Sequence, residues 1–104
     1  MNYTTFNAGG KEYKLRLPTS AVIKLEERLG YNPLHIFGDG TQTPKVTNLV
    51  DFLWAALYIN HNVSYEEACV IFDAWLDDGN TPPEFLPIVI EVYKNSGLIK
   101  KVKN

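Results

Sequence analysis

The densest group of potentially reactive side chains is a set of carboxylates in the second half of the chain. Asp73 and Asp77 are four residues apart and would share one face of a helix, and Asp78 and Glu84 follow closely. Paired carboxylates can hold Mg²⁺ or act as general acid and base. Because acidic side chains are mostly solvated, the simpler interpretation is a charged outer face. Asp77 and Asp78 fall where a helix dipole disfavours negative charge, and we interpret this conflict as the sign of a partner-binding edge.

The single cysteine, Cys69, offers a second possible chemistry. A nucleophilic thiol needs a base beside it, and His35 and His61 are the two histidines available. Cys69 lies one position off the apolar stripe of its predicted helix, where a small buried residue fits, so we interpret it as structural.

A zinc site needs about four closely spaced ligands, and Cys69, His35 and His61 do not provide them. The segment Gly38-Asp39-Gly40 lacks the lysine of a phosphate loop. We therefore expect a protein that is not an enzyme and that binds no metal or cofactor.

The aromatic residues point instead to recognition of another protein. Trp54, Tyr58, Trp75 and Tyr93 recur at helical spacing, and core packing explains most of them. Two tryptophans and three tyrosines on three helices nevertheless exceed what so small a core needs, and both residue types are favoured interface anchors. For any one residue alone, burial in the core is the simpler explanation. The candidate anchors are Trp54, Leu57 and Tyr58 on one predicted helix, with Phe72 and Trp75 on the next.

A β-hairpin over residues 3–17 is the first element that the sequence predicts. Asn7-Ala8-Gly9-Gly10 supplies a turn between two arms of alternating polarity, and Pro18 closes the second arm. The apolar face comprises Thr4, Phe6, Tyr13, Leu15 and Leu17. An isolated hairpin is marginal in water, so this face should lie on the helices.

The first predicted helix covers residues 20–29, with Thr19 or Ser20 as its N-cap and Gly30 just after its end. A long connection follows over residues 31–46. Its apolar first half should pack down, and its glycine-containing second half should be exposed and mobile.

The second predicted helix covers residues 48–59. Thr47 or Asn48 can cap it, and Asp51 suits the positive end of its dipole. The run from Phe52 to Ile59 has almost no polar face. Such a helix lies at the centre of a core or keeps one face for a partner.

The third predicted helix starts at a capping box formed by Ser64 and Glu67. Its inward stripe comprises Ala68, Ile71, Phe72, Trp75 and Leu76.

The last predicted helix has a second capping box, from Thr81 to Glu84, but Pro87 conflicts with a regular helix that begins there. We therefore expect either a start near Glu84 or a distorted first turn. Gly97 should end this helix, with Leu98 closing a Schellman motif against Tyr93. Its inward residues are Phe85, Val89, Val92 and Tyr93.

Together these elements predict one domain over residues 1–104. Its class is mainly α (α+β), with the hairpin at 3–17, a compact bundle of about four helices over 20–97, and a frayed tail at 98–104. The 104 residues are 45% apolar, which suits a globular core.

The bulk composition also limits the kinds of partner. Ten basic and twelve acidic residues give a net charge of −2, which argues against nucleic acid. The longest apolar stretch, from Phe52 to Ile59, is far shorter than the ~20 residues of a membrane span, and no secretory leader is predicted. A chain with one cysteine forms no internal disulfide, which fits a reducing cytoplasm.

The order of segments resembles one known family. The segments are Gly10-Lys11-Glu12-Tyr13-Lys14-Leu15-Arg16-Leu17, Leu25-Glu26-Glu27-Arg28-Leu29-Gly30, Asn32-Pro33-Leu34, Leu53-Trp54-Ala55-Ala56-Leu57, Ser64-Tyr65-Glu66-Glu67-Ala68, Trp75-Leu76-Asp77-Asp78-Gly79 and Ser96-Gly97. Over nearly the whole chain, this order is similar to the tail assembly chaperones of siphophages and prophages of low-GC Gram-positive bacteria. None of the segments carries a catalytic signature.

The resemblance implies a non-catalytic chaperone that binds the phage tape measure protein and keeps it soluble while the tail tube assembles. It also implies action in the cytoplasm of the bacterial host and absence from the mature virion. Self-association is a further possibility, whereas neither nucleic acid nor membrane is expected as a partner.

Three alternatives remain at this stage. A structural head-tail connector or tail component of the virion would form stable rings. A small DNA-binding domain would need a basic recognition helix, and none of the four predicted helices has clustered Lys or Arg. An enzyme based on Asp73, Asp77 and Asp78 would bind divalent metal.

Overall fold

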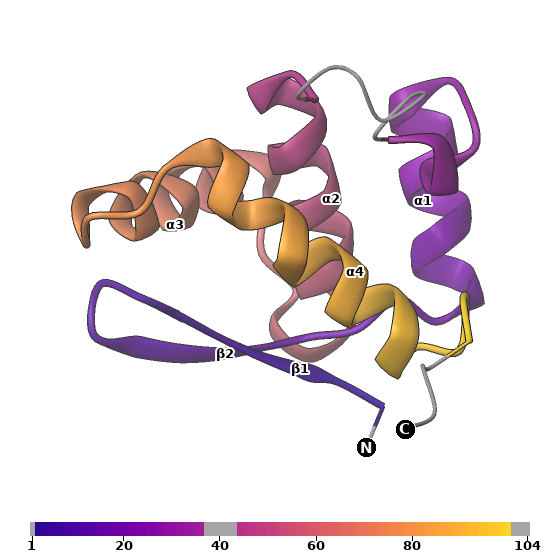
Figure 1. The fold of residues 1–104 in the computed structure, drawn as a ribbon, viewed down its shortest axis with the longest axis horizontal. Helices are drawn as coiled ribbons and strands as arrows, with labels where there is room; N and C mark the ends of the chain where they lie inside the picture. Colours follow the sequence, from indigo (N-terminus) through magenta and orange to yellow (C-terminus); the bar gives the residue numbers. More distant parts are fainter. Residues whose placement is uncertain (1, 37–43, 101–104) are drawn as a thin grey trace.

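A computed structural model describes residues 2–36 and 44–100 of the chain. A two-stranded antiparallel hairpin is followed by a compact group of helices, which confirms the predicted fold class (Figure 1). The strands are β1 (Thr4–Ala8) and β2 (Lys11–Leu15), and the α-helices are α1 (Thr19–Leu29), α2 (Val46–His61), α3 (Tyr65–Asp77) and α4 (Leu86–Asn95). Two 3₁₀ turns are η1 (Pro33–His35) and η2 (Pro82–Phe85).

The hairpin has a tighter turn than the sequence pattern predicted. Ala8 pairs with Lys11, so only Gly9 and Gly10 form the turn. Both have positive φ, 60° and 78°, as a two-residue turn of this kind requires. Phe6 pairs with Tyr13 on the face that is buried against the helices, as expected. Thr4, which was predicted for the same face, is only partly buried.

Helix α2 occupies the centre of the molecule, because half of its sixteen residues are buried and it contacts α1, α3 and β2. Its central position in the core is thus confirmed, while Trp54 and Tyr58 on the same helix stay partly exposed. The predicted caps of α1 and α2 are wrong. Each helix starts earlier than expected, so Thr19, Ser20, Thr47 and Asn48 already lie inside the first turn. The N-cap positions are Pro18 and Lys45, and neither makes a side-chain cap bond.

The predicted capping box of α3 is present. The N–H of Glu67 donates to Oγ of Ser64 at 3.1 Å, and the N–H of Ser64 donates to Oε1 of Glu67 at 2.9 Å. These two bonds satisfy backbone donors that have no partner within the helix.

The start of α4 resolves the conflict over Pro87. The N–H of Thr81 donates to Oε1 of Glu84 at 3.0 Å, and the chain then makes the 3₁₀ turn η2 before the α-helix begins at Leu86. Pro87 thus lies in the first turn of α4, where its missing N–H breaks no helical bond. The sequence left two alternatives, a start near Glu84 or a distorted first turn, and the structure has features of both: a 3₁₀ turn over Pro82–Phe85 and an α-helix that begins at Leu86. At the other end, the N–H of Leu98 donates to the carbonyl of Tyr93 at 2.9 Å, as expected for a Schellman motif.

The core is one cluster with an aromatic centre at Phe85, which is fully buried. Its ring centroid lies 5.4 Å from that of Trp75 and 5.5 Å from that of Phe72, both on α3. The rings of Phe6 in β1 and Phe52 in α2 lie 5.8 and 6.0 Å away. The 3₁₀ turn therefore inserts one residue between the hairpin and two helices.

The first half of the connection after α1, which was predicted to pack down, does so only in part, because Leu34 and His35 are exposed. Pro33 and Ile36 are buried. Its second half lies outside the described residues, as do the last four residues of the predicted tail. Within the tail, Leu98 packs on the core and the next two residues are exposed.

Among the described residues, no helix combines the length and hydropathy needed to cross a membrane.

Polar bonds hold the hairpin to the ends of α2 and α3. The N–H of Lys14 donates to Nε2 of His61 at 2.9 Å, and the N–H of Arg16 donates to the carbonyl of Ala56 at 3.0 Å. At the hairpin turn, the N–H of Gly9 donates to Oδ2 of Asp78 at 2.8 Å. The negative charge at the end of α3 therefore has an internal role, although it opposes the helix dipole.

Replacing Asp78 with Ala should lower the free energy of unfolding by about 1 kcal/mol, because the N–H of Gly9 loses a charged acceptor. The neighbouring Asp77→Ala removes the same charge from the same helix end and is the matched control. It should be neutral or stabilising by a few tenths of a kcal/mol, since it only relieves the dipole conflict. Urea denaturation of both variants tests this, and equal effects would contradict the role of Asp78.

Stability should fall on mild acidification because His61 accepts a hydrogen bond through Nε2. Burial, and then the charges of Lys11 and Lys14, lower the pKa of His61 below its ordinary value of 6.5. The unfolded chain therefore takes up this proton first. The contribution of His61 is complete above about pH 6.5 and is lost as the pH falls through the lower folded-state pKa.

Denaturation between pH 7 and pH 5 should show a smaller loss of stability in His61→Gln than in the unmodified chain. His35→Gln, which changes the other histidine, is the matched control for the substitution itself. A pH profile that is the same in all three proteins would show that the bond from Lys14 does not depend on the protonation of His61.

Candidate functional site

Three partly exposed aromatic rings form a cluster on the surface of α2 and α3. Trp54 and Tyr58 are one turn apart on α2, and Tyr65 is the first residue of α3. The ring centroid of Trp54 lies 6.4 Å from that of Tyr58 and 6.3 Å from that of Tyr65. Both pairs meet edge to face, an arrangement that aromatic quadrupoles favour. We call Trp54, Tyr58 and Tyr65 the aromatic cluster.

Two cations from α1 lie over these rings. Lys24 places Nζ 4.5 Å from the ring centre of Tyr58 and 5.9 Å from that of Trp54. Arg28, one turn later, places Cζ 3.7 Å from the ring centre of Tyr65 and 5.8 Å from that of Trp54. Each is within the range of a cation–π interaction, worth about 0.5–1 kcal/mol at an exposed site.

The cluster is fixed from beneath by a buried carboxylate. Nε of Arg28 donates to Oδ1 of Asp51 at 3.0 Å, and Asp51 is only 3% exposed. The predicted role of Asp51 at the positive end of the dipole is wrong, because α2 begins at Val46 and Asp51 lies beyond its first turn. A buried carboxylate needs a partner, and Arg28 supplies it.

The electrostatics of the cluster keep Arg28 charged and Tyr65 neutral. Partial burial works against the guanidinium of Arg28, but its bonds to Asp51 and Tyr65 and the charge of Asp51 outweigh this and raise its pKa. Burial, reinforced by Asp51, raises the pKa of Tyr65 in spite of the nearby Arg28. The surface therefore offers a fixed positive charge beside neutral rings.

The structure separates the five predicted anchors into two groups. Leu57, Phe72 and Trp75 lie in the core, while Trp54 and Tyr58 are partly exposed. The first three are therefore closed to a partner in this conformation, and the last two belong to the aromatic cluster.

Sequence reasoning missed three members of this site, Tyr65, Lys24 and Arg28. One signal could have found Arg28: an aspartate, Asp51, stands in an otherwise apolar helix and requires a basic partner on a neighbouring element.

Among the reactive residues considered from the sequence, Asp78 accepts the bond from the hairpin turn. Cys69 is partly buried against the core, and His61 accepts its bond from the hairpin. Over residues 2–36 and 44–100, no group of three or more His, Cys, Asp or Glu side chains could hold a metal ion.

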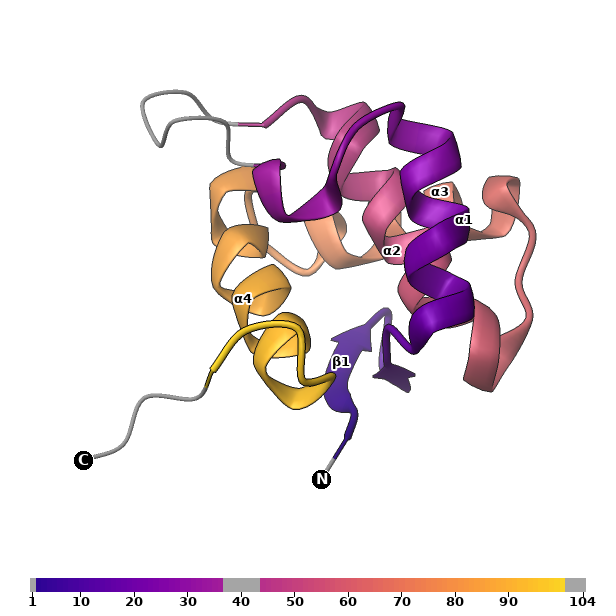
Figure 2. The ribbon, with the colours of Figure 1, turned by 90° about the vertical axis from the view of Figure 1, so that its right-hand side faces the viewer.

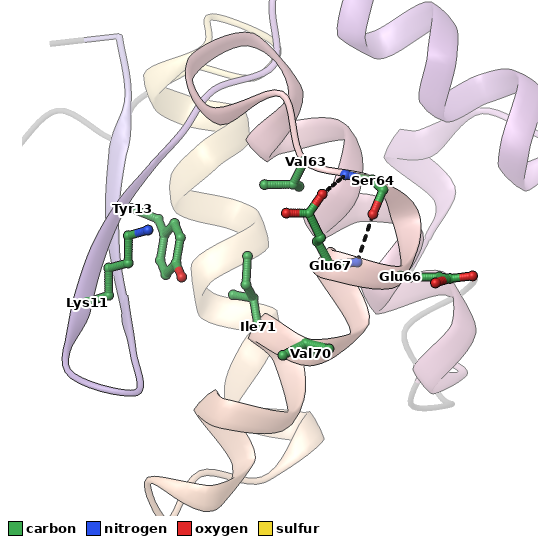
Figure 3. A pocket seen from close by; sticks show the side chains of 8 residues that line it. All are labelled: Lys11, Tyr13, Val63, Ser64, Glu66, Glu67, Val70 and Ile71. Carbon is green, nitrogen blue, oxygen red and sulfur yellow. Dashed lines mark hydrogen bonds between the residues drawn. The ribbon is translucent and has the colours of Figure 1, made fainter.

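A second surface feature is a groove between the hairpin and the start of α3, with a volume of about 380 Å³ (Figure 3). Its lining residues are Lys11, Tyr13, Val63, Ser64, Glu66, Glu67, Val70 and Ile71. Lys11 and Tyr13 lie on the hairpin side, and Val63, Glu67 and Ile71 lie on the side facing them (Figure 3). The carboxylate of Glu67 is bonded to Ser64, and Glu66 points away from the hairpin (Figure 3). We call this the hairpin groove.

Residues 2–104 match a family described as a family of unknown function (DUF6096), and the chain belongs to that family. No curated protein and no solved structure matches the chain. The aromatic cluster offers rings beside a fixed positive charge, and the hairpin groove offers an apolar slot beside exposed acidic residues of α3.

Replacing Arg28 with Ala should lower the free energy of unfolding by about 2 kcal/mol, because Asp51 is left buried without a partner. This loss is smaller than that expected for a fully buried ion pair. The Arg28 side chain is 43% exposed, so water can partly take its place beside Asp51 in the variant. Lys24→Ala is the matched control and should cost under about 1 kcal/mol, because Lys24 loses only cation–π contacts.

A double variant, Arg28→Met with Asp51→Leu, should recover most of the stability lost in Arg28→Ala. Thermal and urea denaturation of the four proteins provide the comparison. If Arg28→Ala is no more destabilised than Lys24→Ala, the ion pair does not fix the cluster.

Proposed function

We propose that this protein is a tail assembly chaperone of the siphophage type, which binds the tape measure protein and keeps it soluble while the tail is assembled. It would act in the cytoplasm of the bacterial host and leave before the virion is complete. The proposal rests on the order of segments along the chain, and the observation that carries it furthest is the aromatic cluster on the surface.

The cluster supports the proposal because rings outside the core are suited to a client rather than to stability. Trp54, Tyr58 and Tyr65 are adjacent, partly exposed, and contributed by two helices. Trp and Tyr bury much area at little conformational cost and act as hot spots in interfaces. Together they form a platform of adjacent rings that spans α2 and the start of α3.

A tape measure protein is the kind of client that such a platform fits. As the family resemblance implies, it is long and helical, with apolar stretches that aggregate when unshielded. An amphipathic helix would lay its apolar face on the rings, as in helix-in-groove recognition. Lys24 and Arg28 would then pair with acidic side chains beside that face, which sets the direction of the client on the platform.

Coexpression with the long helical protein encoded next to this chain should keep that client in the soluble fraction. The double variant Trp54→Ser with Tyr58→Ser should lose this effect, with binding weakened by about tenfold or more, as for loss of hot-spot aromatics. Both residues are partly exposed, so the variant should remain folded, which circular dichroism would verify.

Tyr3→Ser is the matched control, because Tyr3 is also partly exposed and has a cation over its ring, with Nζ of Lys14 at 5.0 Å. It lies before β1, outside the aromatic cluster, and should leave client solubility unchanged. A client that precipitates with the intact chain contradicts the proposal. Stable rings of this chain in purified virions would favour the alternative of a structural connector or tail component.

A further inference from the structure

The hairpin groove combines exposed apolar area with an acidic margin. Val70 projects from the middle of α3 and is 66% exposed, the largest value among the exposed large apolar residues of the described chain. With Tyr13, Val63 and Ile71 it lines an apolar slot (Figure 3). An apolar side chain this exposed, beside a slot, is typical of an interaction surface.

The charges around Val70 are of one sign. Glu66 and Asp73 are one turn before and one turn after it and share its exposed face. Glu67 lines the slot as well, and α3 has no Lys or Arg. Lys11 is the one basic residue among those lining the groove, and it lies over the ring of Tyr13, 5.3 Å from its centre. An occupant should therefore carry apolar side chains next to basic ones.

The chain itself contains such a segment at residues 99–104, Ile99-Lys100-Lys101-Val102-Lys103-Asn104. Three lysines separate and flank two β-branched apolar residues, which matches both the slot and its margin. Ile99 and Lys100 are exposed where the described chain ends. We propose that the hairpin groove binds this tail of a second copy of the chain.

The tail reaches the groove of another molecule more readily than its own. The yellow end of the described chain and the loop between α2 and α3, which borders the groove, lie on opposite sides of the molecule (Figure 2). The molecule is about 30 Å across in its smallest dimension. The four residues after Lys100 span at most about 14 Å when fully extended.

Binding of this kind is head to tail. The groove of one copy receives the tail of the next, and its own tail is left to enter a third, so the contacts form a ring or an open chain. The contact uses neither the aromatic cluster nor any client, so the inference stands independently of the proposed function.

Sedimentation equilibrium of the full chain over a range of concentrations tests the proposal. The average mass should rise with concentration and should fall again at high salt, because the contact depends on exposed charge pairs. A groove variant, Glu66→Lys with Asp73→Lys, and a tail variant, Lys100→Glu with Lys101→Glu, should each raise the dissociation constant by about tenfold or more. A mixture of the two should associate again, since the intact tail of one fits the intact groove of the other.

Two further variants separate the groove from general effects of charge and folding. Glu26→Lys with Glu27→Lys reverses two exposed acidic residues on α1 and should leave the association unchanged. Val70→Ser removes apolar area from an exposed position and should weaken association without loss of stability. A chain that stays monomeric at all concentrations, or a tail variant that associates like the unmodified chain, would overturn the proposal.

Discussion

The contact on which the rest of the structure depends is the burial of Phe85 between the hairpin and two helices. Its ring touches aromatic side chains from β1, α2 and α3, so elements distant in the sequence meet at one point. Phe85 reaches this point because η2 places it there before α4 begins. A regular helix from Pro82 onward would carry Pro87 beyond its first turn, where the ring of proline clashes with the backbone. The irregular start of α4 is thus what allows the core to close.

The surface features follow from how the outer elements are attached to this core. Helix α2 is buried on several sides, yet its contact with α1 leaves Trp54 and Tyr58 partly open under Lys24 and Arg28. The hairpin is held at its turn and along its second strand by polar bonds to the helix ends. Between these attachments and the start of α3, the hairpin groove is left unfilled. The aromatic cluster and the hairpin groove are therefore on different sides of α3, one at Tyr65 and the other at Val70.

Much of the fold was predictable because its signals are local. The glycine turn, the capping box at Ser64, the stripe on α3 and the irregular start of α4 each depend on residues close in the sequence. The capping box was confirmed, the turn is tighter than predicted, and all of the stripe except Leu76 is buried. The N-caps of α1 and α2 were wrong, since Thr and Ser promote caps but do not fix which residue starts a helix. The candidate site was less predictable. Which rings stay exposed depends on packing between helices, and the pairing of Arg28 with Asp51 joins residues twenty-three positions apart.

The cations over the aromatic cluster have a consequence for selectivity. Exposed rings attract other apolar surfaces without discrimination, and in a crowded cell they promote aggregation. Here the chain covers its own rings, one with Lys24, which is held there by cation–π contacts, and one with Arg28, which is also bonded to Asp51. A partner of the kind proposed above would compete with Lys24 for the rings of Trp54 and Tyr58, whereas Arg28 would remain paired with Asp51. Binding would then be favourable only for a partner whose contacts replace the cation–π interactions of Lys24. In the absence of such a partner, the lysine would keep other apolar surfaces off the rings.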